Sequence, residues 1–171
     1  MVADADLHLR AAGARGAVLA GIMGPRAALP DNSPRAVMAR TLLRLREEDP
    51  DSFAGLVQSA DGSLELLVTT STAATAKAIR DARTLSGDAI PVRVVEGLRF
   101  SHAVLEQLRD EILARQAELR SRGINITEFG VDDRANRVRV GIKGLTPQMA
   151  KLVALEFGAD MLNIIEGGEW A

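Results

Sequence analysis

The sequence has no cysteine and no tyrosine, one tryptophan, and two histidines among its 171 residues. Without cysteine the chain can form no disulfide, no thiol nucleophile and no thiolate metal site. Aromatic side chains on which bases could stack are scarce, and the formal net charge is −2, so the chain has no positive field to steer nucleic acid toward it. We therefore expect no nucleic-acid partner.

Long hydrophobic runs are also missing. No segment approaches the roughly 20 apolar residues of a membrane-spanning helix, so we expect no membrane partner. Residues 17–23 are apolar, but the stretch is short, and Asp4 and Asp6 precede it where a secretion signal carries positive charge. We expect residues 1–33 to form a weakly ordered arm. The lack of a clear signal indicates a cytoplasmic protein, with secretion as the alternative.

The overall composition is that of a folded protein. Hydrophobic residues make up 47% of the chain and charged residues 26%, which is typical of globular proteins and not of disordered ones. A chain of this length holds one ordinary domain or two very small ones. With four phenylalanines and one tryptophan, its core must be built mainly from Leu, Val, Ile and Ala.

The last two-thirds of the chain repeats one order of elements. Residues 53–97 have the pattern of strand, tight turn, strand, helix and strand, and they end on Glu96-Gly97. Residues 126–167 follow the same order and end on Glu166-Gly167. Alternating and helical hydrophobic periods distinguish the strands from the helices. The sequence predicts an α+β fold of two ββαβ units, each a three-stranded, mainly antiparallel sheet with a helix on one face.

Helix start and stop signals divide the chain into segments. Ser33-Pro34 begins a helix that Asp49-Pro50 ends, and Ser101 caps a long amphipathic helix that ends at Gly123 and joins the two units. We expect an arm over residues 1–33, a helix with the first ββαβ unit over 34–100, the joining helix over 101–123, and the second ββαβ unit with a C-terminal tail over 124–171.

Two polar clusters suggest chemistry but fit local structure better. Ser101 and His102 are adjacent on a helix and therefore do not face each other as a nucleophile and its base must; we interpret Ser101 as a helix cap. Residues 132–136 lack the central glycine and distal glutamate of a calcium loop and suit a turn. Phosphate loops, dinucleotide fingerprints and zinc spacings are absent. We expect no catalytic residue, no metal and no cofactor.

Two surface features could bind a partner. Basic residues line the outward face of the second hairpin, either as a solvated face that protects an exposed strand or as a docking surface for an acidic partner; they are Arg134, Arg137, Arg139 and Lys143. Residues 167–171 contain two glycines and the only tryptophan. This tail is either frayed or an extended peptide offered to another protein.

The repeated motifs resemble a known family. Phe53-Ala54-Gly55-Leu56, Asp61-Gly62 and residues 64–69 resemble the first half of the pro-segments of α-lytic protease and the streptogrisins, which are chymotrypsin-like serine proteases. Residues 130–140, with their Asp-x-Arg-x-Asn turn and Val-x-Val strand, are similar to the second-half motif, and residues 161–166 to the closing strand. The resemblance covers about residues 47–167.

The resemblance implies a non-catalytic role. In that family the pro-segment is a folding chaperone and inhibitor of its protease, whose hairpin pairs with the second sheet of the pro-segment while the tail occupies the cleft. It implies a docking strand formed by Arg137, Val138, Arg139, Val140 and Ile142, and a cleft-binding tail formed by Gly167, Gly168, Glu169, Trp170 and Ala171. No protease domain follows here and no catalytic triad is present, so we expect no enzyme activity. The alternative is an interaction or regulatory module that kept the fold and changed partner.

Overall fold

The computed structural model describes residues 32–87 and 90–168. The arm expected over residues 1–33 therefore lies outside the described residues except for Asn32 and Ser33. Glu169, Trp170 and Ala171, which belong to the expected cleft-binding tail, also lie outside them.

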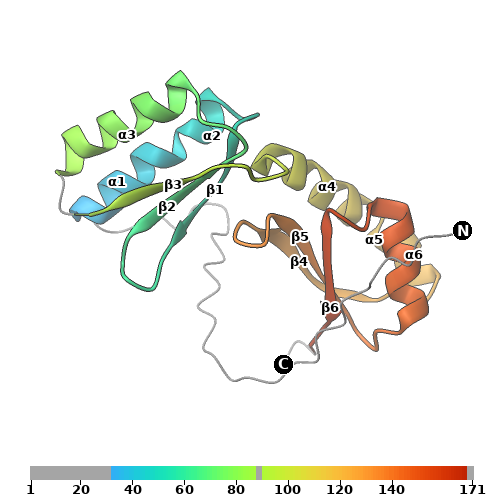
Figure 1. The fold of residues 1–171 in the computed structure, drawn as a ribbon. Helices are drawn as coiled ribbons and strands as arrows, with labels where there is room; N and C mark the ends of the chain where they lie inside the picture. Colours follow the sequence, from blue (N-terminus) through green and yellow to red (C-terminus); the bar gives the residue numbers. More distant parts are fainter. Residues whose placement is uncertain (1–31, 88–89, 169–171) are drawn as a thin grey trace, which may run out of the picture. The chain divides into compact units, whose positions relative to one another are not determined.

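The described residues have the α+β fold that the sequence predicts, with the ββαβ order occurring twice (Figure 1). The first part of the chain contains α1 (Pro34–Leu43), α2 (Leu45–Glu48), β1 (Phe53–Gln58), β2 (Leu64–Val68), α3 (Ala73–Ser86) and β3 (Val92–Val95). The second part contains α4 (His102–Ala114), α5 (Gln116–Ser121), β4 (Ile126–Asp132), β5 (Arg137–Ile142), α6 (Pro147–Phe157) and β6 (Leu162–Glu166).

Each sheet is mixed, not mainly antiparallel as expected. The strand orders are β1-β2-β3 and β4-β5-β6. In each sheet the first two strands form an antiparallel hairpin, whereas the third runs parallel to the second. The parallel pairing arises because α3 and α6 are crossover connections, which return the chain to the end of the sheet where the preceding strand began.

The two units repeat each other down to the pairing register. Phe53 lies opposite Val68 and Ile126 opposite Ile142, and in both units the register shifts immediately afterwards, which marks a bulge in the first strand. The third strands also correspond, because Val95 lies opposite Leu67 as Ile165 lies opposite Gly141. Each paired position of the first sheet therefore has a counterpart in the second.

Side chains cap the starts of the longer helices. Ser33, Thr72, Ser101 and Thr146 each accept a hydrogen bond from a backbone N–H in the first turn of α1, α3, α4 and α6, respectively. The interpretation of Ser101 as a helix cap is thus confirmed, since its Oγ accepts from the N–H of Val104 at 3.4 Å. Such caps satisfy N–H groups that have no partner within the helix.

The joining helix is divided at Arg115 into α4 and α5, although the sequence predicts one continuous helix. Arg115 has φ −98° and ψ 7°, outside the α-helical range. Its guanidinium lies 5.2 Å from the centre of the Phe157 ring and bonds Glu156, both on α6. The break thus occurs where the helix side chains contact α6. The N-terminal helix is similarly divided, at Arg44.

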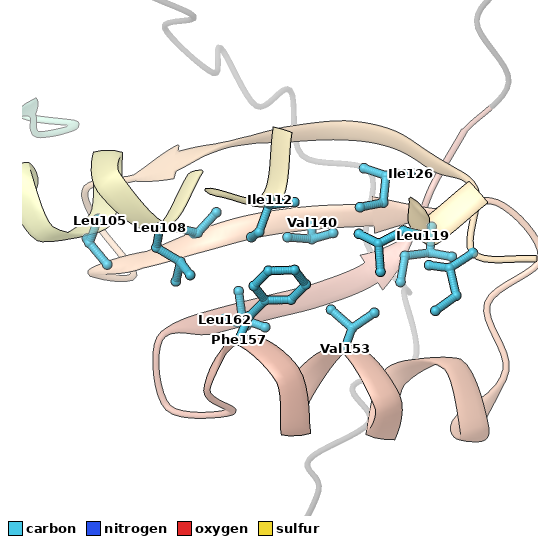
Figure 2. Packing of buried hydrophobic residues seen from close by; sticks show 12 residues of the cluster. Leu105, Leu108, Ile112, Leu119, Ile126, Val140, Val153, Phe157 and Leu162 are labelled. Carbon is cyan, nitrogen blue, oxygen red and sulfur yellow. The ribbon is translucent and has the colours of Figure 1, made fainter. Parts of the chain in front are cut away.

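Each sheet has its own apolar core. The first contains Met38, Leu42, Leu45, Phe53, Leu64, Leu66, Val68, Ala78 and Ala82. The second contains Leu105, Leu108, Ile112, Leu119, Ile124, Ile126, Val138, Val140, Ile142, Val153, Phe157 and Leu162. Figure 2 shows the second core, in which Val140 lies among side chains that include Ile112 of α4 and Phe157 of α6. As the composition implies, aliphatic side chains dominate both cores.

Residues 133–136 form a turn between β4 and β5, as predicted. Asp132 Oδ1 accepts a hydrogen bond from the N–H of Ala135 at 3.0 Å, and Asn136 has a φ of 52°. Asn and Asp favour such turns because their side chains bond nearby backbone groups and because Asn tolerates positive φ.

No helix in the described ranges has the length and apolar character needed to cross a membrane.

Candidate functional site

The expected docking strand, residues 137–142, is not an edge. It forms β5, which lies between β4 and β6 and pairs with both. Val138, Val140 and Ile142 are fully buried in the second core, where Val140 is visible in Figure 2. The expectation that this strand adds to a partner's sheet is therefore wrong, because β6 already occupies the side of β5 that the hairpin leaves open.

The basic face of the second hairpin makes contacts within the chain. The Arg139 guanidinium bonds Glu128 Oε1 of the neighbouring strand at 3.1 and 3.3 Å on the side of the sheet away from the core. Arg134 Nη2 donates to the carbonyl oxygen of Gln58 at 3.0 Å. Arg137 is exposed at the start of β5. Arg134 and Arg139 thus already have partners within the chain, with which an acidic docking partner would have to compete.

β6 is an edge strand, and two hydrogen bonds define which of its backbone groups face outward. The N–H of Val138 donates to Met161 at 2.8 Å, and the N–H of Gly167 donates to Ile142 at 2.9 Å. In a parallel sheet, the N–H and C=O of one residue both point to the strand on one side, and those of the next residue both point to the other side. Met161, Asn163, Ile165 and Gly167 therefore face β5. Leu162, Ile164 and Glu166 face the opposite side, where the described residues contain no further strand.

Within the described residues, the edge of β6 from Leu162 to Ile165 also lacks the charges, prolines and bulges that protect exposed strands. Charged side chains, prolines, bulges and covering groups normally discourage an edge from pairing with other chains. The other edge strands have them: β1 and β4 carry bulges, Gln58 of β1 is bonded by Arg134, and β3 follows Pro91 and contains Arg93. From Leu162 to Ile165, β6 has neither charge nor proline nor bulge.

Gly167 and Gly168, the two described residues after β6, have different surroundings. Gly167 is buried and continues the pairing with β5. A Cβ placed on it would lie 2.1 Å from Thr127 Oγ1 and 2.9 Å from the carbonyl carbon of Gly141, so only glycine fits. Gly168 is exposed, with no atom within 4 Å of such a Cβ. The tail therefore departs at Gly168, one residue later than the sequence predicts.

The glutamates at the ends of the two units have matching structural roles. Glu166 accepts hydrogen bonds from the N–H groups of Gly144 and Leu145 at 2.9 and 3.0 Å. Glu96 accepts one from Ser71 Oγ at 2.6 Å. Each carboxylate ties the end of the third strand to the loop that precedes the crossover helix. The Glu-Gly endings found in the sequence are thus part of the fold's construction.

The described residues contain no group of three or more His, Asp or Glu side chains placed to hold a metal ion.

A scan against models of protein families found no match to this sequence, and a search of curated proteins found none. Among the described residues, the row of outward backbone groups on β6 is one feature with which an extended segment of another chain could pair. The sequence does not reveal this edge, because alternation of polar and apolar residues identifies the two faces of a strand but not the strands beside it. The uncharged run from Leu162 to Ile165 was the available signal.

Proposed function

We propose that this chain is a non-catalytic, pro-segment-like protein that binds a chymotrypsin-like serine protease and acts as its folding chaperone and inhibitor. The observation that carries the proposal is the unprotected β6 edge, which continues through Gly167 into the tail residues 168–171. In this proposal the docking strand is β6 and not residues 137–142.

Strand addition explains how such an edge would recognise its partner. The outward N–H and C=O groups of Leu162, Ile164 and Glu166 would pair with an extended segment or hairpin of the protease. These bonds use backbone atoms, so they need no side-chain match. The tail residues 168–171 would then reach the cleft, as the resemblance to the pro-segments implies.

The same edge would account for chaperone activity. Proteins rich in non-local strand pairs fold slowly, because the entropy of closing long loops is lost before the contacts form. A preformed edge gives the partner's segment a fixed row of hydrogen-bonding groups on which to order. If this chain binds the folded protease, or its folding transition state, more tightly than the unfolded protease, it favours formation of that state.

The second candidate is an interaction or regulatory module with a different partner. This candidate is favoured because β6 offers backbone groups, and strand addition through backbone hydrogen bonds accepts many partner sequences. The two candidates make different predictions for proteases. Only the first predicts that the chain inhibits an enzyme of the α-lytic type and raises its refolding yield.

The decisive experiment places one lysine on either of two corresponding strands. Ile165→Lys adds a charge to β6 on the face away from the core, whereas Val95→Lys adds it at the matching position of β3. An edge lysine opposes strand addition. Inhibition of an α-lytic-type protease should weaken at least about tenfold, about 1.4 kcal/mol, in Ile165→Lys and little in Val95→Lys.

Thermal unfolding of both variants provides the control for folding. If the wild-type chain neither inhibits the protease nor improves its refolding yield, the protease proposal is wrong. If it does both and the two lysine variants behave alike, the partner is right but the β6 edge is not the docking strand.

A further inference from the structure

We propose that β6 is also the strand through which two copies of this chain associate. The β6 edges of the two copies pair antiparallel about a two-fold axis at Ile164, so that their second sheets become one continuous sheet. This inference concerns the free chain and does not rest on the proposed function. If both hold, a second copy and the protease compete for one edge, and self-association covers that edge while the protease is absent.

The backbone pattern of β6 is symmetric about Ile164. Within residues 32–87 and 90–168, β6 pairs with β5 alone, and the backbone groups of Leu162, Ile164 and Glu166 point to the other side. In an antiparallel pair, residues directly opposite each other can exchange both of their N–H···O=C bonds. The two-fold axis places Ile164 opposite Ile164 of the second copy, and Leu162 opposite Glu166. Every outward backbone group of β6 then has a partner.

The side chains that this pairing brings together carry no like charges. Asn163 lies opposite Ile165 of the second copy, on the face of the sheet away from the core, in a pair whose side chains approach closely. The charged residue of the strand, Glu166, lies opposite Leu162, and its carboxylate already accepts two backbone N–H bonds within its own chain. Since like charges directly opposite each other are what destabilise strand pairs, the β6 edge is compatible with itself.

The helix next to this edge leaves room for a second copy. Val153 of α6 points into the core (Figure 2), and Glu156 bonds an arginine of α5, which packs on β4. By helical periodicity, Ala150 and Ala154 lie on the opposite flank of α6 from Glu156, the flank nearer to the β6 edge. Helices pack about 8–10 Å apart, and these small side chains allow two α6 helices to lie side by side over the joined sheet.

Association through β6 should stop at two copies. A two-fold contact uses the same surface on both partners and closes on itself. The outer edges of the joined sheet are then the two β4 strands, each with a bulge between Ile126 and Glu128. The edge strand β3 of the first sheet contains Arg93 and follows Pro91. Bulges, charges and prolines all oppose further pairing, so the expected product is a dimer and not a fibre.

Sedimentation equilibrium of the full-length chain tests the association. A contact limited to one strand edge and one helix flank belongs to the small class of interfaces, so we expect a dissociation constant between roughly 1 µM and 1 mM. The average mass should rise from 18.2 kDa toward twice that value as the concentration crosses this range. A mass that stays at the monomer value throughout, or rises past the dimer, would overturn the proposal. Because no protease is present, the result is independent of the proposed function.

Two double variants test the register by exchanging charge. Asn163→Lys/Ile165→Lys places lysine opposite lysine, and Asn163→Glu/Ile165→Glu places glutamate opposite glutamate, so each should weaken association at least about tenfold. An equal mixture places lysine opposite glutamate and should associate at least about tenfold more tightly than either variant alone. Both positions face away from the core, and thermal unfolding checks that the variants fold.

Val95→Lys, at the matching position of β3, is the control and should associate as the wild type does. A dimer that persists in both double variants, a mixture that gains no affinity, or a Val95→Lys chain that is monomeric would each contradict pairing through β6.

Hydrogen exchange in the wild type gives evidence even if a variant does not fold. The N–H of Ile164 points away from β5, whereas the N–H of Ile165 faces it. Raising the protein concentration through the range of association should increase the protection of Ile164 at least about threefold and that of Ile165 much less, because only the first N–H gains a partner. No change at Ile164, or an equal change at both, would exclude the proposed strand pairing.

Discussion

Asn136 and Phe100 exchange two hydrogen bonds across the start of α4. Asn136 Nδ2 donates to the carbonyl oxygen of Phe100 at 2.7 Å, and Asn136 Oδ1 accepts from the N–H of Phe100 at 2.9 Å. Asn136 is 7% exposed, and its φ is 52°. The β4–β5 turn thus holds the chain at the point where it enters the joining helix.

Asn136 should be intolerant of substitution for two separable reasons. Asn136→Gly keeps the backbone conformation but loses both hydrogen bonds, and should lower the free energy of unfolding by about 1–3 kcal/mol. Asn136→Ala also forces a Cβ into left-handed backbone, which adds about 1 kcal/mol. Urea unfolding of both variants measures the two effects, and equal stabilities for glycine and alanine would contradict the second.

Gly167 and Gly168 should respond in opposite ways to the same change. Gly167→Ala places a Cβ against Thr127 and the backbone of Gly141, and should destabilise the second unit by about 1–3 kcal/mol. Gly168→Ala meets no atom and should leave stability unchanged within about 0.5 kcal/mol. Thermal unfolding of the two variants checks the contrast. A stable Gly167→Ala variant would show that Gly167 does not pack tightly against Thr127 and Gly141.

Removal of residues 168–171 tests the tail separately from the β6 edge. Because the chain leaves the sheet at Gly168, this deletion should change the free energy of unfolding by less than about 0.5 kcal/mol. Under the proposed function it should weaken inhibition of an α-lytic-type protease by at least about tenfold. If inhibition is unchanged, the tail does not occupy the cleft, although the edge can still dock.

Proline should be far more harmful in β5 than at the outward positions of β6. Val140→Pro removes a ladder hydrogen bond in a central strand and a fully buried side chain, so the second unit should not fold. Ile164→Pro removes an N–H that faces outward, and should keep the sheet at the cost of some apolar packing. Circular dichroism distinguishes the two outcomes. A folded Val140→Pro variant would contradict the strand order.

Asp49 should contribute to the loss of stability in acid. Thr72, the cap of α3, donates to Asp49 Oδ2 at 2.7 Å, and this hydrogen bond holds the pKa of Asp49 below its ordinary value. A carboxyl whose pKa is lower in the folded state stabilises the fold above its unfolded-state pKa, and this contribution is lost as pH falls through the folded-state pKa. Asp49→Asn should therefore flatten the stability profile below about pH 4.

Thr72 provides the matched control for this pH effect. Thr72→Ser keeps the hydroxyl and should keep the acid-dependent loss, whereas Thr72→Val removes both the donor to Asp49 and the cap of α3. Urea unfolding between about pH 2 and pH 6 covers the range in which the carboxyl titrates. A profile that is the same in Asp49→Asn and in the wild type would show that the bond to Thr72 does not bear on stability.

Local chemistry made much of the fold predictable. Asp61-Gly62 identified the first hairpin, Thr146-Pro147 the start of α6, and the alternation of Val138, Val140 and Ile142 the second sheet. These signals act within a few residues, so the sequence displays them directly. They led to the correct repeat of elements and to the correct interpretation of Ser101.

The errors concern relations between distant residues. The neighbours of β5 depend on where the chain returns after α6, and alternation is the same for central and edge strands. The break at Arg115 lies where its side chain contacts Glu156 and Phe157 of α6, while Arg and Gln are good helix formers. The bonds between Asn136 and Phe100 join residues far apart in sequence. None of these has a local signal.

Because β3 and β6 pair with β2 and β5 in the same register, the sequence of one third strand can be placed position by position on the other. Val92–Val95 and Leu162–Ile165 occupy corresponding positions against β2 and β5. A chain that carries the sequence Leu-Asn-Ile-Ile in place of residues 92–95 would present a second uncharged edge on the first sheet. If backbone pairing alone attracts a partner, the altered chain should bind two partner molecules, one at each uncharged edge. If it still binds one, the selectivity lies in what surrounds β6 and not in the strand.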